Sequence, residues 1–155
     1  MSIISNIKLK PIGFIETKAT EEEIKHRKAV SKIILFKKLT KALDGIKDFS
    51  HLFIIFYMHK ISKNERKFLK VHPRGRTDLP LLGVFSTRTP YRPNPIGVTL
   101  VKLVRKKGNV LIVRGLDAWN GTPVLDIKPF DYWDIAKKIR VPKWWRKLEK
   151  ERKSK

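Results

Sequence analysis

Cysteine is absent from the 155 residues, which excludes disulfides, thiolate metal sites and cysteine nucleophiles. No apolar run approaches the roughly 20 residues that a membrane-spanning helix needs. The start of the chain, MSIISNIKLK, lacks the apolar stretch and cleavage site of a signal peptide. Since 41% of the residues are hydrophobic, a core can form. We therefore expect a compact, soluble and cytoplasmic protein with no membrane partner.

Closely spaced glycines are also missing. The eight glycines stand at positions 13, 45, 75, 83, 97, 108, 115 and 121, and no two are separated by a single residue. The sequence therefore contains neither a GxGxxG turn nor a Walker A loop. Any nucleotide-like cofactor must be held by a different device.

Acidic residues are few. Lysine and arginine number 36 against 14 aspartates and glutamates, which gives a net charge of +22 and a pI near 10.5. The excess is clustered in residues 60–76 and 137–155. Such clustering is typical of a protein that binds a polyanion, nucleic acid above all. The alternative is a solvated, lysine-rich surface with no ligand.

The second basic cluster interleaves aromatic residues with cations. Trp144 and Trp145 stand between Lys143 and Arg146, so cations for phosphates adjoin indoles on which bases can stack. Alternatively, the two tryptophans pack this segment onto the rest of the protein. Pro142 suits the first turn of a helix, and we predict one over residues 143–153.

Short β-type segments dominate the chain. We predict strands over 7–16, 32–36, 50–59, 83–86 and 122–130, and a hairpin formed by 96–105 and 109–116. Residues 17–31 are expected to form a loop with at most one helical turn, and residues 39–46 a turn closed by Gly45. The continuous apolar segment 50–59 fits a strand buried on both faces. The pattern favours a mainly β protein, a small barrel with peripheral short helices, rather than βαβ units.

Two segments concentrate unusual residues. In GVFSTRTPYRPNPIG, residues 83–97, three prolines stiffen a loop that carries Arg88 and Arg92. A rigid loop with two guanidinium groups suits an anionic ligand group, although a purely structural turn is the alternative.

The other segment is GLDAWNGTPVLDIKPF, residues 115–130. Its Asn120-Gly121 turn lies between Asp117 and Thr122, and its backbone amides are candidates to cradle a polar ligand. Trp119 is a candidate to stack on a ring. Asp126 lies in an apolar strand and is expected to pair with a nearby cation.

The histidines do not predict a metal site. His51 and His59 share one face of the 50–59 strand but are roughly 26 Å apart if the strand is regular. They cannot bind one ion together, and without cysteine a catalytic zinc is not expected. His59, at the strand end, is the better pocket candidate, and His51 reads as a satisfied core residue.

These segments resemble a known family. PIGFI at 11–15, FSHLFIIFYMH at 49–59 and the two segments above occur in this order in the TrmO (YaeB-like, TsaA-like) family. The resemblance covers about residues 7–132. It implies a non-Rossmann β-barrel and S-adenosylmethionine-dependent methylation of tRNA, at N6 of threonylcarbamoyladenosine beside the anticodon. It also implies a homodimer with the cofactor near the subunit interface. We assign residues 1–136 to the barrel domain and 137–155 to a basic, aromatic tail.

The resemblance implies roles for individual residues. The expected cofactor contacts are Arg27, His59, Lys60, Arg88, Val98, Asp117, Asn120, Gly121 and Thr122. Asn120 departs from the family pattern, which has aspartate there.

The remaining roles are hypotheses about catalysis and RNA. Asp117, Asp126 or His59 would accept the proton of the target nitrogen, and Tyr91, Tyr57 or Trp119 would face the sulfonium. The residues expected to contact the modified base or the tRNA backbone are Arg92, Asn94, Arg74, Arg76, Lys143, Trp144 and Arg146. The rival interpretations are a non-enzymatic RNA-binding barrel and a methyltransferase that acts on another tRNA base or on a small molecule.

Overall fold

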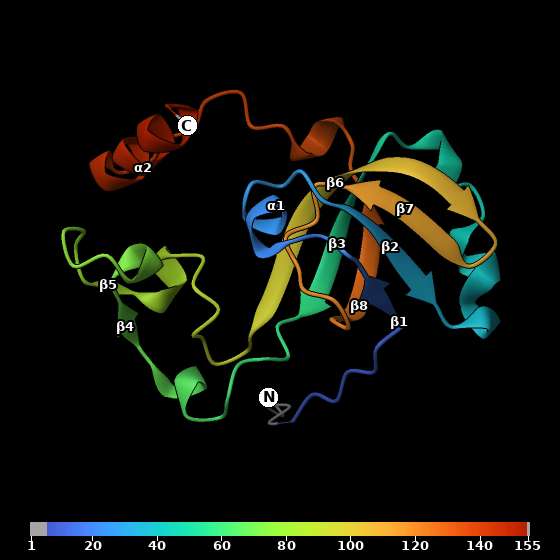
Figure 1. The fold of residues 1–155 in the computed structure, drawn as a ribbon, viewed down its shortest axis with the longest axis horizontal. Helices are drawn as coiled ribbons and strands as arrows, with labels where there is room; N and C mark the ends of the chain where they lie inside the picture. The colour runs from blue at the N-terminus through green and yellow to red at the C-terminus, as the bar shows by residue number, and fades with distance from the viewer. Residues whose placement is uncertain (1–5, 155) are drawn as a thin grey trace, which may run out of the picture. The chain divides into compact units, whose positions relative to one another are not determined.

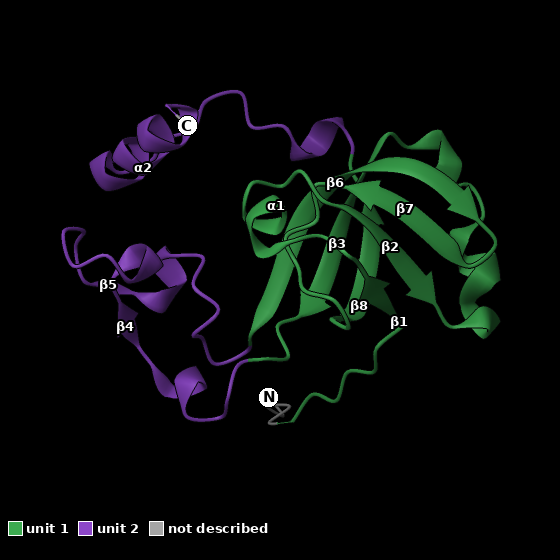
Figure 2. Cartoon of the chain, viewed as in Figure 1, with its two compact units in different colours: residues 1–60, 95–130 green, residues 61–94, 131–155 purple. Residues whose placement is uncertain are grey.

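The computed structural model describes residues 6–154 and divides the chain into two compact units. Residues 1–60 and 95–130 form the first unit, and residues 61–94 and 131–155 form the second (Figure 2). The C-terminal helix therefore belongs to the same unit as the 61–94 segment. The domain boundary expected at residue 136 stays a prediction.

The first unit is a closed barrel of six strands (Figure 1). Its members are β1 (Gly13–Glu16), β2 (Val30–Leu35), β3 (His51–Tyr57), β6 (Ile96–Lys107), β7 (Val110–Arg114) and β8 (Pro123–Pro129). Around the barrel their order is β1-β2-β7-β6-β3-β8, and every neighbouring pair is antiparallel. The expected mainly β barrel is confirmed.

One face of each strand forms the core. In β3, Leu52, Ile54 and Phe56 are buried, while the residues between them are only half-buried. The prediction that segment 50–59 is buried on both faces is therefore wrong. Apolar residues also occupy the outer face of β3. The strand therefore has the composition of one that is buried on both faces, but in this barrel its outer face is only half covered.

Antiparallel closure gathers three connections at one end of the barrel. Glu16 pairs with Lys32, Val30 with Arg114, and Tyr57 with Ile96. The segments 17–29, 58–95 and 115–122 therefore leave and re-enter the barrel at the same end, which we call the loop end. The connections 36–50 and 108–109 lie at the opposite end.

Several element boundaries differ from the predictions. The strand expected over 7–16 begins only at Gly13. Ile12 still bonds to Val124 and Phe36 through its backbone, but Pro11 before it has no N–H to donate. The 17–31 loop contains helix α1 (Glu21–Lys25), where Thr20 and Glu23 form a capping box. The hairpin is confirmed as β6 and β7.

The second unit has little regular structure. It contains β4 (Lys70–Val71) paired with β5 (Leu82–Gly83), and helix α2 (Lys143–Lys153), which confirms the predicted C-terminal helix. The strand expected over 83–86 is wrong, because residues 84–86 turn as a 3₁₀ helix. Thr87 closes this turn by donating from its N–H and its hydroxyl to the Val84 carbonyl.

The remaining 3₁₀ helices lie in both units. Their bounds are Lys37–Leu43, Ile46–Asp48, Glu65–Lys67, Pro73–Gly75 and Tyr132–Asp134. Within residues 6–154, no helix is long and apolar enough to span a membrane.

Gly13 marks the closest approach between β1 and β2. A Cβ atom there would lie 2.2 Å from the Ile34 carbonyl oxygen and 2.7 Å from Leu35 Cα. Both are backbone atoms and cannot rotate away. We therefore expect Gly13→Ala to lower the free energy of unfolding by about 3 kcal/mol, toward the upper end for overpacked sites. Urea unfolding followed by circular dichroism measures this loss.

The matched control is Gly83→Ala, where the nearest atom to an added Cβ is 3.9 Å away and φ is −58°. That variant should change the free energy of unfolding by less than about 0.5 kcal/mol. Equal stability of the two variants would contradict the close approach at Gly13.

Candidate functional site

The connection between β7 and β8 is tied to β1 at the loop end. The Asn120 side-chain oxygen accepts a hydrogen bond from the Thr17 N–H at 3.0 Å. The Gly121 N–H donates to the Ile15 carbonyl at 2.8 Å, and the Ile15 N–H donates to the Thr122 carbonyl at 3.0 Å. Asn120 thus has a structural partner that needs an acceptor oxygen and no charge, a role that asparagine fills as well as the aspartate that the resemblance leads one to expect.

The expected amide cradle is partly occupied by the protein itself. Gly121 donates to Ile15, and the Thr122 N–H donates to the Trp119 carbonyl at 3.2 Å. The Thr122 side chain is also buried. These two amides close the turn and the barrel, so side chains of the 115–122 segment are better placed to meet a ligand.

The first connection contacts the same segment. The Gly115 N–H donates to the Ala29 carbonyl at 2.9 Å. Arg27, which ends the turn after α1, has a φ of 54°, and its charge acts on Asp117. Burial raises the pKa of Asp117, and the Arg27 charge opposes this by lowering it. Asp117 as a whole residue remains accessible to solvent. Neighbouring atoms therefore surround part of its carboxyl group without closing it off from water.

Lys60 brings the third connection to the same place. Its Nζ lies 4.5 Å from the centroid of the Trp119 ring, a cation–π geometry. His59 and Lys60 follow the end of β3 in an exposed turn. The Met58 N–H donates to the Pro95 carbonyl at 2.7 Å, which holds the end of β3 against the start of β6.

The pairing of β3 with β6 also fixes the position of Val98. A Cβ on Gly97 would meet the Phe56 ring at 2.4 Å, so glycine allows the close contact between β6 and the ring. Val98, next along the strand, pairs with Ile55 and is exposed on the outer face of the barrel.

The other two candidate residues of the barrel lie on its outer face. Asp126 forms an ion pair with Lys128 at 3.0 Å and accepts the Ile127 N–H, so the expected cation partner is confirmed. His51 shares a hydrogen bond with the Ser50 hydroxyl and packs edge-on against Phe130. His51 is therefore satisfied, but the prediction of a core position is wrong because it points away from the interior.

In the second unit, Arg92 builds the proline-rich loop. Its Nη2 donates to the Val84 carbonyl at 3.0 Å and to the Thr87 carbonyl at 2.9 Å. Arg88 is exposed, with its guanidinium carbon 6.0 Å from the centroid of the Trp145 ring. Tyr91 packs edge-on against Phe68. Arg92 therefore uses its guanidinium to hold the loop, whereas the guanidinium of Arg88 faces the Trp145 ring.

The residues expected at tRNA fall into two groups. Lys143, Arg146, Arg74 and Asn94 are exposed. Trp144 is half-buried and meets Trp145 edge-on at 5.2 Å, so the interpretation that the pair packs α2 onto its unit gains support. Arg76 is engaged with two carboxylates, and a phosphate contact would have to compete with them.

Nothing in the described part of the chain gathers metal ligands. Across residues 6–154, no group of three or more histidines and carboxylates is placed to hold an ion.

Comparison with known proteins identifies the family. A model described as the tRNA-methyltransferase O N-terminal domain matches residues 15–134. The chain belongs to this family. The match covers three of the four segments from which the resemblance was inferred, those at 49–59, 83–97 and 115–130, and the inference is confirmed.

Two named relatives illustrate the range of the tRNA-methyltransferase O family. A Methanocaldococcus jannaschii protein named "Probable S-adenosyl-L-methionine-binding protein" is 39% identical over 136 residues, which are 87% of this chain and 97% of that protein. A mouse protein named tRNA (adenine(37)-N6)-methyltransferase is 39% identical over 135 residues, which are 81% of this chain and 31% of that protein.

Solved structures agree with the fold. A crystal structure of TrmO from Pseudomonas aeruginosa superposes with a TM-score of 0.70 at 27% identity, and the match covers 92% of this chain and 63% of that chain. A second TrmO crystal structure also gives 0.70, at 32% identity and 88% and 63% coverage. The chain thus spans a little under two thirds of the length of these TrmO chains.

The barrel brings together most of the sequence-predicted cofactor contacts. Arg27, Lys60 and the 117–122 turn come from three different connections and meet at the loop end. Two contacts were missed, the Lys60–Trp119 pair and the Asn120–Thr17 hydrogen bond. No local pattern signals either, because each joins segments distant in sequence.

The raised pKa of Asp117 has a consequence for stability. The unfolded chain releases this proton near its ordinary pKa of about 3.9, before the folded chain does. Stability is therefore lost as pH rises from about 4 through the folded pKa. Asp117→Asn has no proton to release. Relative to the native protein, we expect its free energy of unfolding to increase over this pH range and then level off, as measured by urea titration at successive pH values.

Arg27→Gln provides the companion variant. It removes the charge that lowers the pKa of Asp117, so a carbon-detected NMR titration of this carboxyl should give a higher pKa than in the native protein. Parallel pH profiles for Asp117→Asn and the native protein, with no effect of Arg27→Gln, would contradict the crowded carboxyl.

Proposed function

We propose that this protein is an S-adenosylmethionine-dependent tRNA methyltransferase that methylates N6 of threonylcarbamoyladenosine next to the anticodon. Membership of the family and the names of its relatives support the reaction class. The observation that carries the proposal is the meeting of Arg27, Lys60, Asp117 and Trp119 at the loop end.

The residues at the loop end suit this cofactor chemically. S-adenosylmethionine supplies an electrophilic methyl group on a cationic sulfur, which leaves as a neutral thioether. The Trp119 ring already holds the Lys60 cation on one face, so this indole is a surface of the kind that attracts a sulfonium. Arg27 and Lys60 provide positive charge for a carboxylate.

Among the candidate proton acceptors, Asp117 fits best. Methyl transfer to N6 requires that nitrogen to lose a proton, and a carboxylate with a raised pKa takes up a proton more readily. Asp126 is neutralised by Lys128 on the outer face of β8. Tyr91 packs against Phe68, which does not favour it for this role, and His59 remains the alternative to Asp117.

A homodimer forms part of the proposal. Ile96, Val98 and Leu100 are exposed along the outer face of β6, opposite the half-buried Tyr57, Ile55 and Phe53 of β3. An apolar sheet face of this kind is suited to a second copy of the chain. Since it begins beside the β3 end that carries His59 and Lys60, a cofactor site near the subunit interface follows naturally. A cytoplasmic location accords with a tRNA substrate.

The proposed reaction is tested with nucleosides. The purified protein is incubated with methyl-labelled S-adenosylmethionine and total tRNA, and the tRNA is digested and separated. We expect label in N6-methylated threonylcarbamoyladenosine. Label in another nucleoside or in a small molecule would show that the substrate is a different one. If the protein bound tRNA but transferred no label, the non-enzymatic RNA-binding barrel would be the remaining interpretation.

The cofactor site is tested by a matched pair of tryptophan variants. Trp119→Ala should weaken binding of S-adenosylmethionine at least tenfold in calorimetry, because the indole face is lost. Trp133→Ala is the control, since that side chain is 96% exposed and belongs to the second unit. Equal affinities of both variants would contradict a cofactor at Trp119.

The dimer is tested on the outer face of β6. Leu100→Lys places a charge on the apolar face and should convert a dimer into monomers in sedimentation velocity. Val30→Lys, an exposed valine on β2, carries the same charge elsewhere on the barrel and should remain dimeric. A native protein that sediments as a monomer would contradict the dimer.

A further inference from the structure

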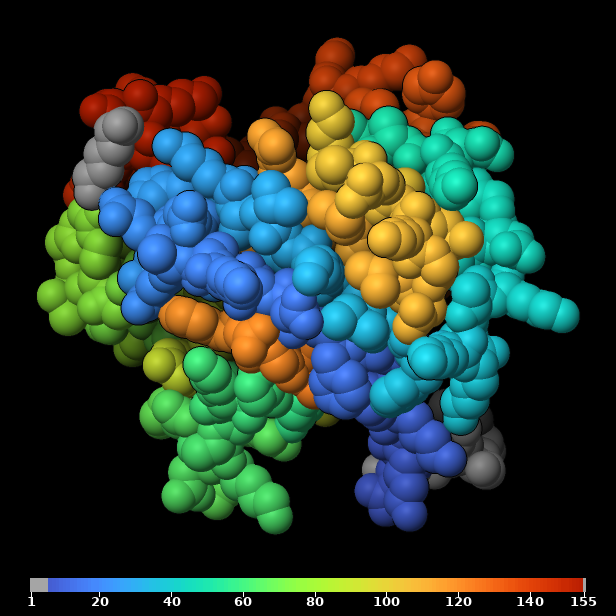
Figure 3. Space-filling model, turned by 45° about the vertical axis from the view of Figure 1, so that its right-hand side comes forward, coloured from blue at the N-terminus to red at the C-terminus, as the bar shows by residue number. Residues whose placement is uncertain are grey.

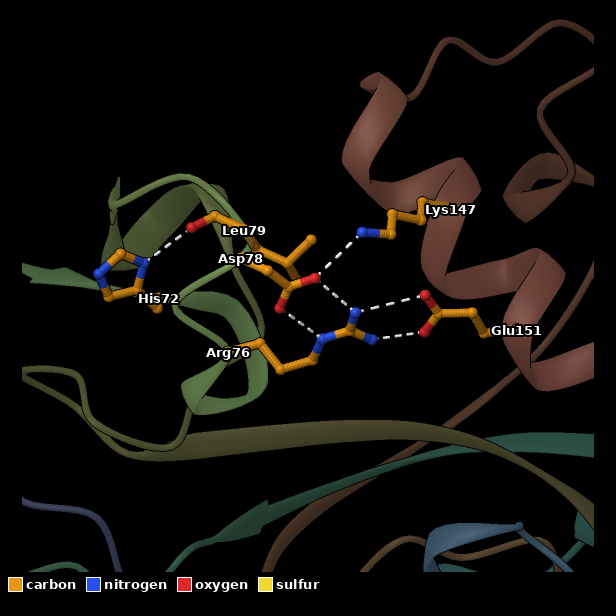
Figure 4. Close-up of polar contacts among 6 residues, drawn as sticks. All are labelled: His72, Arg76, Asp78, Leu79, Lys147 and Glu151. Atoms are coloured by element: carbon orange, nitrogen blue, oxygen red, sulfur yellow. Dashed lines mark hydrogen bonds and ion pairs between the residues drawn. The ribbon is translucent and has the colours of Figure 1, made fainter.

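Helix α2 is fixed to its unit by a compact cluster of charges, which we call the Arg76 cluster: Arg76, Asp78, Lys147 and Glu151 (Figure 4). Arg76 donates from Nε and Nη2 to the Asp78 carboxylate at 2.9 and 2.6 Å, and its two Nη atoms also bond to Glu151. Lys147 reaches Asp78 at 3.0 Å. The cluster therefore joins one side of α2 to the turn after residue 75.

The cations of the Arg76 cluster are neutralised where they stand. Two cations face two carboxylates, so the net charge of the cluster is zero. Hydrogen bonds from Arg76, and then from Lys147, lower the pKa of Asp78, which keeps the carboxylate charged. Leu148, 5% exposed, packs on the same side of the helix. In Figure 3 the red helix lies directly against light-green residues of the 61–94 segment.

The side of α2 opposite the buried Leu148 carries three exposed cations. Lys143, Arg146 and Lys150 are exposed and follow one another at intervals of three and four residues, which places them on one helix face. At 1.5 Å per residue they span about 10 Å. Lys153 continues this face but pairs with Glu149 at 3.1 Å. We call Lys143, Arg146 and Lys150 the basic stripe.

We propose that the basic stripe binds the phosphate backbone of RNA, and that the Arg76 cluster holds α2 so that the stripe faces outward. The proposal deepens the proposed function, since it assigns the surface that grips the RNA substrate. Arg76 is then a positioning residue and Lys147 belongs to the fold, whereas Arg146 and its two neighbours contact the ligand.

The chemistry of the stripe favours RNA over other polyanionic partners. Phosphates repeat every few ångströms along one strand, and three long cationic side chains in a row match such a repeat. A membrane surface would need apolar residues on the same face, but Leu148 faces the protein and the two tryptophans are half-buried.

The test measures the salt dependence of RNA binding. A short fluorescein-labelled RNA hairpin is titrated by anisotropy from about 50 to about 300 mM KCl, without S-adenosylmethionine. Each phosphate contact contributes about 0.9 to the slope of log K against log salt on a duplex and about 0.7 on a single strand. The triple variant Lys143→Gln/Arg146→Gln/Lys150→Gln should lower the slope by between about 2 and 3.

The control removes equal charge from the first unit. Lys37→Gln/Lys41→Gln/Lys47→Gln alters exposed lysines of the 36–50 connection and should change the slope by less than about 0.5. Lys143→Arg/Lys150→Arg keeps the stripe cationic and should retain the native slope. Equal slopes for the two triple variants would overturn the proposal, as would the absence of RNA binding by the native protein.

The positioning role has its own readout. Arg76→Met should accelerate amide hydrogen exchange across α2 while the β3 amides keep their protection, and it should weaken RNA binding although no cation of the stripe has changed. Unchanged exchange in α2 would overturn this role. These measurements use no cofactor, so a negative methylation assay would not affect them. Equally, if the basic stripe proved not to bind RNA, the calorimetric test of the cofactor site at Trp119 would still stand.

Discussion

Antiparallel closure of a small barrel is the constraint on which the rest of this molecule depends. When every strand pairs antiparallel with its neighbours, alternate connections must emerge at alternate ends. Here the connections 36–50 and 108–109 use one end, and the three connections that carry Arg27, Lys60 and Asp117 use the other. Arg27, Lys60 and Asp117, far apart in sequence, meet at the loop end for this topological reason.

The same chain uses its excess positive charge in two ways. Some cations stabilise the fold itself. Arg92 closes the proline-rich loop through carbonyls, and Arg76 and Lys147 join α2 to a turn. Each of these cations stabilises a local segment, whereas without a partner it would add to the mutual repulsion of positive charges on the surface. Other cations, Lys143 and Arg146 among them, are exposed on α2. A composition of +22 cannot distinguish the two kinds, because the placement of carboxylates and backbone carbonyls around each cation separates them.

Local patterns predicted the fold where the physics is local. The Lys-Lys-Gly turn between two apolar runs gave the β6–β7 hairpin, and Pro142 marked the start of α2. Prediction failed where a neighbour decides the outcome. Segment 50–59 is apolar on both faces, yet one face lies outside the barrel, and residues 84–86 turn because Thr87 bonds back to Val84.

In the candidate site, too, residue types could be read from the sequence but contacts between distant segments could not. The residue types at Asp117 and Trp119 indicated a ligand site before any geometry was known, and the resemblance to the family added Lys60. The pairing of Lys60 with Trp119 could not be predicted, because it depends on barrel register. Arg92 was expected at the ligand, and its Nη2 instead serves two carbonyls of its own loop. A guanidinium suits both tasks equally, so residue type alone does not decide between them.

The absence of glycine-rich loops then has a physical counterpart at the loop end. Such loops hold phosphates by presenting several backbone N–H groups to one anion. S-adenosylmethionine carries no phosphate, and its sulfonium and carboxylate are recognised by an aromatic face and by cations. In this barrel the amides of Gly121 and Thr122 are consumed in closing the turn and the β1–β8 seam. In the proposed site, ligand recognition therefore falls to side chains, and a barrel whose connections converge at one end supplies them without a glycine-rich anion loop.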